Sequence, residues 1–381
     1  MNLSFDFTLS RTLNGGRIRQ AREMAALTQS ELARRVNVSQ AMIAHIENGL
    51  KQPSVELAEA IARETKATID FLQRPSGPNL GEGTLLFRAR ADASAKQLTQ
   101  ARRMAECVLE MYAGMAAQFD LPPVTLRPIQ GTPDSAAAAA REMLGLRPGQ
   151  PIAHLVRSFE KAGGIVITIP ALPGREAFAV WANDRPIVGI VPTTAGDRLR
   201  LGVAHEVGHL LMHVGPTSRR QAEQDAYRFA AELLMPETPM RYEMGLGPDL
   251  ERLSRLKLKW GVSVNALLMR ARELKIVSRR QFEAMMKQIA VRGWRIREPE
   301  NLDLPIERPR ALRQMAEQIY GADLDFKEIT KDYNLPLSFV HAVMEGCASY
   351  HETTSTSHSS ATVIDIGAFG TRGRTPTGVA G

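Results

Sequence analysis

The segment LGVAHEVGHLLMH, residues 201–213, constrains the fold of this chain more than any other stretch. His205 and His209 stand four positions apart in it, and Glu206 follows the first histidine. Side chains four positions apart share one face of a helix, so both imidazoles can reach the same point in space. The spacing predicts a helix with two convergent histidines; the alternative is an ordinary half-exposed helix face.

Two convergent imidazoles on a helix are a typical pair of metal ligands, and Glu206 is placed to reach a water molecule at the same metal. Zinc in a catalytic site takes three protein ligands and lowers the pKa of its bound water to about 7, so a nearby carboxylate can act as general base. Cys107 and Cys347 lie outside any Cys-x-x-Cys pattern, which argues against a disulfide framework and a cysteine-based zinc site. Further metal ligands must then be histidines or carboxylates.

A third ligand is expected from the next helix, QAEQDAYRFAAELLMP, residues 221–236, which ends at a proline. Its buried face is marked by apolar residues at helical spacing: Ala226, Phe229, Ala230 and Leu233. Glu223 lies three positions before Ala226 and seven before Ala230, so it continues that face and is the favoured ligand. Asp225 is the alternative ligand, and Glu232 is interpreted as a solvated residue.

Residues 201–213 and the spaced pattern from Glu223 to Pro236 resemble the ImmA/IrrE-type metallopeptidase family. Shorter matching pieces extend the resemblance over residues 85–294: Phe87-Arg88, Ala140-Arg141-Glu142, Glu160 before Gly163-Gly164, and Trp181 before Asp184-Arg185-Pro186. The resemblance implies a zincin-like α+β fold and a thermolysin-like Zn²⁺ site, with His205, His209 and Glu223 as ligands and Glu206 as base. It also implies a protein substrate, because family members cleave repressors of mobile elements or stress responses.

Two further residues lie close to the expected site. The family tends to carry Asn where this chain has Tyr227, a position suited to a hydrogen bond behind a metal ligand. His213 follows His209 by four residues and shares its helix face, so it is either a hydrogen-bonding partner of the site or a packed core histidine. No cofactor besides Zn²⁺ is expected.

The surrounding residues 84–299 mix helical and strand patterns. Helices are expected near residues 95–119 and 135–144, strands at 165–169 and 187–191, and helices again over 199–295, which predicts an α+β domain. Between Arg252 and Arg295, twelve Lys or Arg residues accompany only Glu273 and Glu283. These charges are interpreted as solvated helix faces, with a supplementary surface for DNA or an acidic partner as the alternative.

Near the N-terminus, the segment TQSELARRVNVSQAMIAHIEN, residues 28–48, predicts two short helices joined by a tight turn. Thr28 and Glu31 can form a capping box for the first helix, Asn37 can turn the chain, and Ser39 can cap the second. In a DNA-binding helix-turn-helix, the start of the second helix enters the major groove of DNA. The alternative interpretation of this segment is a helical bundle with capped turns. The expected contacts are Gln40, Ala41 and His45 at base edges, and Gln29, Ser39 and Lys51 nearer phosphates.

This segment resembles the Cro/C1-type (Xre) helix-turn-helix family through Thr28-Gln29-x-x-Leu32-Ala33, Val38-Ser39-x-x-x-Ile43, Ile46-Glu47-x-Gly49 and Pro53-Ser54. The resemblance implies binding to a double-stranded DNA operator as a homodimer on two half-sites. Ten Lys or Arg against seven Asp or Glu between Arg11 and Arg74 leave three net positive charges, a modest excess for neutralising phosphates. A dimer would double the phosphate contacts.

The remaining chain divides by composition. Residues 74–83, rich in Pro and Gly, predict a linker, residues 300–350 a small helical region, and residues 351–381, rich in Ser, Thr and Gly, a disordered tail. No apolar run approaches the ~18 to 20 residues that span a bilayer and no secretory signal is visible, so no membrane partner and a cytoplasmic location are expected. The net charge of +7 over 381 residues permits an anionic partner.

Together these patterns predict a multidomain chain: an all-α helix-turn-helix domain over residues 11–73, an α+β zincin-like metallopeptidase domain over 84–299, and a helical C-terminal appendix. The predicted function is a DNA-binding transcriptional regulator with a zinc-dependent endopeptidase that cleaves a repressor-like or antitoxin-like partner. The alternative is an Xre-type regulator whose peptidase-like domain senses a metabolite, such as an acyl-CoA, without proteolysis. Retention of Glu206 favours the peptidase, because a sensor can lose that residue.

Overall fold

The computed structural model describes residues 12–77, 86–89, 94–169, 175–182, 185–191, 195–213, 218–245 and 247–348. The greater part of the expected linker, residues 78–83, and the tail expected at 351–381 lie outside the described residues. Within the described ranges, no helix combines the length and the apolar character that a bilayer span requires.

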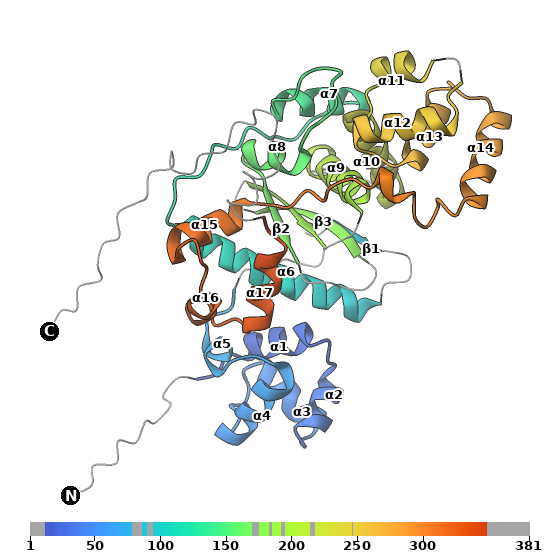
Figure 1. Ribbon diagram of the computed structural model, residues 1–381. Helices are drawn as coiled ribbons and strands as arrows, with labels where there is room; N and C mark the ends of the chain where they lie inside the picture. Colours follow the sequence, from blue (N-terminus) through green and yellow to red (C-terminus); the bar gives the residue numbers. More distant parts are fainter. Residues whose placement is uncertain are drawn as a thin grey trace, which may run out of the picture.

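A four-stranded sheet, built by the described residues, lies at the centre of the molecule (Figure 1). Its strands run in the spatial order β1 (Leu86–Ala89), β3 (Arg175–Ala182), β4 (Arg185–Ile190) and β2 (Ile165–Thr168). β3 pairs antiparallel with β1 and β4, whereas β2 pairs parallel with β4. The strands expected at 165–169 and 187–191 are confirmed, and β1 and β3 are additions that the β-branched runs did not indicate.

The two faces of the sheet contribute to two different cores, because side chains alternate along a strand. On β3, Ala177 and Ala179 pack into the first core and Phe178 and Val180 into the second. Helices α7 (Pro133–Met143), α8 (Leu155–Lys161), α9 (Gly196–Met212) and α10 (Arg219–Leu234) build the first core. α9 lies directly on β3 and β4, and α10 packs against α9 and α7.

The first core continues into a group of helices at one end of the molecule (Figure 1). These are α11 (Glu237–Met244), α12 (Leu250–Trp260), α13 (Val264–Glu273) and α14 (Arg279–Val291), followed by the short 3-10 helix η1 (Glu300–Leu302). Lys257 and Arg270 are buried here, each 2% exposed, and pair with Asp197 and Glu232 respectively. The interpretation of the basic residues as solvated is therefore wrong for these two, while Arg279 and Arg280 are exposed.

The N-terminal helices are α1 (Gly15–Met24), α2 (Gln29–Arg35), α3 (Gln40–Glu47), α4 (Val55–Thr65) and α5 (Ile69–Gln73). The capping box of Thr28 and Glu31 is confirmed, and the hydroxyl of Ser39 accepts a hydrogen bond from the Met42 amide at 3.2 Å. Asn37 makes the turn between α2 and α3 with a φ of 56°, a conformation that asparagine tolerates better than most residues. These local signals account for the two short helices.

The second face of the sheet is covered by α6 (Ala95–Ala116) together with the C-terminal helices α15 (Ala311–Tyr320), α16 (Phe326–Tyr333) and α17 (Leu337–Glu345). The same core takes in Ile18 and Leu72 from the N-terminal helices. Glu110 of α6 accepts from Arg17 at 2.7 Å and from Arg74 at 2.7 Å, and Arg103 donates to Glu23 at 2.6 Å. The sequence pattern of residues 300–350 did not indicate what these helices do. In the structure, α15, α16 and α17 pack in one core with both the sheet and the N-terminal helices.

Candidate metal centre and DNA-binding surface

Helix α9 carries the two histidines and the glutamate of the sequence pattern. His205 and Glu206 are 0% exposed and His209 is 3% exposed, since α9 lies between the sheet and α10. The residues that follow His205 by two and six positions, Val207 and Leu211, are also fully buried. The alternative of a half-exposed helix face is therefore wrong for this segment.

A glycine in α9 allows α10 to come close. A Cβ at Gly208 would lie 2.9 Å from the ring of Phe229 and 3.2 Å from Cα of Ala226, both in α10. The hydroxyl of Ser218 caps α10 by accepting from the Gln221 amide, which fixes the start of the helix about one turn before Glu223. Close packing of the two helices places the carboxylate of Glu223 beside the histidines.

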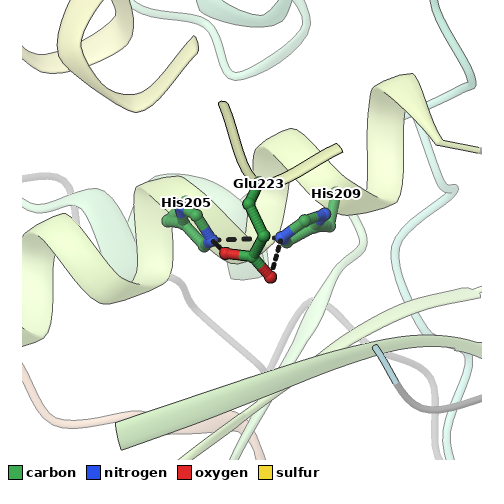
Figure 2. A group of neighbouring side chains, drawn as sticks. All are labelled: His205, His209 and Glu223. Atoms are coloured by element: carbon green, nitrogen blue, oxygen red, sulfur yellow. Dashed lines mark hydrogen bonds and ion pairs between the residues drawn. The ribbon is translucent and has the colours of Figure 1, made fainter. Parts of the chain in front are cut away.

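The side chains of His205, His209 and Glu223 converge (Figure 2). The Nε2 atoms of the histidines are 3.0 Å apart, and oxygens of Glu223 lie 3.4 Å from Nε2 of His205 and 3.8 Å from Nε2 of His209. In a tetrahedral zinc site with bonds of about 2.0 to 2.1 Å, ligand atoms are about 3.3 Å from one another. The donor set of two imidazoles and one carboxylate thus fits zinc in both chemistry and spacing.

The other two carboxylates of α10 make different contacts. Asp225 accepts a hydrogen bond from Gln221 at 2.9 Å and lies 3.9 Å from Nε2 of His213. Glu232 forms an ion pair with Arg270 and accepts from the Glu237 amide at 3.2 Å, and burial raises the pKa of its carboxyl group. Glu232 is therefore part of a paired, largely buried contact between α10 and α13, and its interpretation as a solvated residue is wrong.

Two side chains frame the cluster. The ring of Tyr227 meets the ring of His205 edge to face, with centroids 4.5 Å apart, while 42% of the tyrosine remains exposed. Glu223 keeps 31% of its side chain exposed, so the cluster borders solvent at this residue, whereas the two histidines are buried. On the other side, Nδ1 of His213 lies 3.1 Å from Nδ1 of His209, and burial lowers the pKa of the His213 imidazole.

The start of α3 presents the residues expected to meet DNA. Ser39, Gln40, Ala41, His45 and Lys51 are exposed, and Gln29 is half-buried. Nε2 of Gln40 donates to Oε1 of Gln29 at 2.7 Å, and Gln29 in turn donates to Glu47 at 2.8 Å. The structure brings Gln29 and Gln40 together as one surface at the beginning of α2 and α3.

Sequence reasoning missed the buried support of this surface. The carboxylate of Glu47 accepts from Arg22 at 2.5 and 2.9 Å, and both residues are buried. The two charges lie on α1 and α3, far apart in the sequence, so no local spacing indicates that they pair. Helical periodicity could have shown only that Glu47 follows Ile43 by four residues, on the inner face of α3.

Two family models match separate parts of the chain, one containing the expected DNA-contact residues and the other containing the metal cluster. Residues 18–72 match the family described as helix-turn-helix, and residues 160–272 match the family described as IrrE N-terminal-like domain. No curated protein matches the chain. The second match includes α9 and α10 with all three residues of the cluster. The chain thus fuses a helix-turn-helix domain of the Xre/Cro-C1 type, a DNA-binding type, to a domain of the IrrE N-terminal-like peptidase family.

Proposed function

We propose that this protein is a cytoplasmic, DNA-binding transcriptional regulator that carries a zinc-dependent endopeptidase and cleaves a repressor-like or antitoxin-like protein partner. The observation that carries the proposal is the convergence of His205, His209 and Glu223, with Glu206 on the same buried helix segment. The helix-turn-helix domain supports the DNA-binding half. Linking the two modules raises the effective concentration of the peptidase near targets bound to the same DNA.

His205, His209 and Glu223 would hold the zinc ion through two nitrogens and one oxygen. A bound zinc polarises a water molecule and a carbonyl oxygen, which is the chemistry that peptide hydrolysis needs. Glu206 is next to His205 in α9, and its carboxylate takes the proton of the attacking water and passes it to the leaving amine.

Replacing Glu206 by Gln tests the peptidase. We expect Glu206→Gln to bind as much zinc as the wild type and to abolish cleavage, because the amide cannot accept the proton. Cleavage is measured by identifying the new protein N-termini that it produces in cells expressing either the wild type or Glu206→Gln. The zinc content of both purified proteins is measured separately. New N-termini that persist with Glu206→Gln would contradict the assignment of the base.

The third ligand is tested by metal content alone. Wild type is expected to hold about one zinc per chain after reloading, Glu223→Ala to lose it, and Asp225→Ala to retain it. Loss of zinc in Asp225→Ala alone would instead assign that carboxylate as the ligand. Absence of zinc from the reloaded wild type would remove the metal site and the proposed peptidase with it.

The sensing function is the second candidate, and one observation favours it. Helix α1 of the DNA-binding domain shares a core with α6 and contacts it through Arg17 and Glu110. A ligand that moves α6 can therefore displace the DNA-binding helices without any proteolysis. If regulation of the target genes is identical with wild type and with Glu206→Gln, this candidate replaces the peptidase.

A further inference from the structure

A row of three side chains continues from the metal cluster toward the surface of α10. Nδ1 of His209 lies 3.1 Å from Nδ1 of His213, whose Nε2 lies 3.9 Å from Oδ2 of Asp225. The side chain of His213 is 5% exposed and that of Asp225 is 24% exposed. Gln221 donates to the other oxygen of Asp225 at 2.9 Å, which fixes the position of the carboxylate one helical turn away.

The tautomers along this row follow from the metal site. A neutral imidazole has one nitrogen with a proton and one with a lone pair, so His209 can offer Nε2 to a metal only if its proton is on Nδ1. That proton then points to Nδ1 of His213 at 3.1 Å, which must accept it and therefore carries no proton. The proton of His213 is consequently on Nε2, where it faces the negative charge of Asp225.

Each contact in this row thus stabilises the tautomer on which the contact nearer the metal cluster depends. Asp225 stabilises the tautomer of His213 that leaves Nδ1 as an acceptor, and this acceptor stabilises the tautomer of His209 that leaves Nε2 free for a metal. The hydrogen bond between His209 and His213, which lies behind a metal ligand, also sets the orientation of the His209 ring and increases its basicity. His205 is held differently, since its ring packs edge to face on Tyr227.

We infer that His213 is a positioning residue of the metal site, which accepts the Nδ1 proton of His209 and is itself oriented by Asp225. The inference rests on the zinc site of the proposed function. It also assigns Asp225 to this outer contact, where it acts on the metal only through His213.

The test measures the zinc dissociation constant of the full-length protein by competition with a zinc-binding dye, which requires no substrate. His213→Leu removes the acceptor, and we expect it to weaken zinc binding about 10- to 100-fold. His213→Asn keeps an oxygen near the position of Nδ1, and its affinity should stay within about threefold of the wild type. His341→Leu, at an exposed position of α17, is the control and should bind zinc as the wild type does.

The two variants separate positioning from packing. His213 is buried, so a purely structural role would tolerate leucine better than the polar asparagine. Equal zinc affinity of His213→Leu and wild type, or equal loss in His213→Leu and His213→Asn, would overturn the inference while leaving the zinc site in place. A wild type that binds no zinc would instead remove the proposed function itself.

Asp225 provides an independent measurement that does not depend on the folding of His213→Leu. Asp225→Ala should weaken zinc binding relative to the wild type, because the tautomer of His213 that accepts from His209 then loses the carboxylate that stabilises it. Its effect should disappear when it is combined with His213→Asn, because the side-chain amide of asparagine has no tautomer that a carboxylate must fix. An undiminished effect of Asp225→Ala in that double variant would show that the carboxylate acts without His213, and it would overturn this part of the inference.

Discussion

At the scale of single residues, a buried charge controls the proposed DNA-reading surface. Glu47 is 4% exposed and forms an ion pair with Arg22, and Arg19 lies 3.4 Å from the same carboxylate, so the carboxylate is held between two guanidinium groups. It accepts from Gln29, and Gln29 accepts from Gln40. The exposed amide of Gln40 is thus held in one orientation before DNA arrives, which lowers the entropic cost of pairing with a base edge.

Removing this amide should affect specific DNA binding more than general affinity. We expect Gln40→Ala to weaken binding to a duplex selected from a random library by about 1 to 2 kcal/mol, or about tenfold, and binding to random duplex hardly at all. Fluorescence anisotropy with both duplexes provides the measurement. Gln318→Ala, at an exposed position of α15, is the control; an equal loss on both duplexes would place Gln40 on the phosphate backbone.

At the scale of secondary-structure elements, the distance between α9 and α10 decides whether a third ligand is available. The histidines of α9 are placed by helical spacing alone, whereas Glu223 reaches them only because Gly208 leaves room for Phe229 and Ala226. Arg141 of α7 secures the other end of α10 by donating to the Leu233 carbonyl at 2.5 Å. The metal cluster is therefore a property of two helices and their contact.

A methyl group at this contact should separate the helices. We expect Gly208→Ala to destabilise the protein by about 1 to 3 kcal/mol, because Phe229 is fully buried and cannot move aside freely, and to weaken zinc binding as Glu223 withdraws. Gly202→Ala in the same helix is the matched control, since a Cβ there meets no atom within 4 Å. It should stabilise the protein by up to about 1 kcal/mol. Chemical denaturation and dye competition measure the two effects.

At the scale of the whole molecule, the sheet lies between two cores, and the buried carboxylate of Glu160 forms hydrogen bonds between an element of the first core and an element of the second. Glu160 of α8 is 6% exposed and accepts from the backbone amides of Arg310 at 3.1 Å and Ala311 at 3.2 Å, at the start of α15. The first amides of a helix have no partner within the helix itself, so Glu160 supplies the cap that α15 lacks. Burial nevertheless dominates and raises the pKa of Glu160 to about 7.

This shift makes the stability of the protein depend on pH. The folded state binds the proton of Glu160 more tightly than the unfolded chain does. The contribution of this proton to the free energy of unfolding is therefore complete below about pH 4.5 and is lost as the pH rises through about 7. A change of this size corresponds to about 3 kcal/mol. We expect Glu160→Gln to lack that loss between pH 5 and pH 8 in chemical denaturation. An unchanged pH profile in Glu160→Gln would show that Glu160 is not the titrating group.

The sequence by itself determined the features that depend on neighbouring residues along one helix. These include the capping box of Thr28 and Glu31, the turn at Asn37 and the shared face of His205 and His209, since such interactions span at most about one helical turn. The tertiary structure decided which carboxylate approaches the histidines, the pairing of Glu232 with Arg270, and the packing of the C-terminal helices beside the N-terminal ones. Those outcomes depend on which faces of distant elements meet, and a helical repeat shows that a face is apolar without showing its partner.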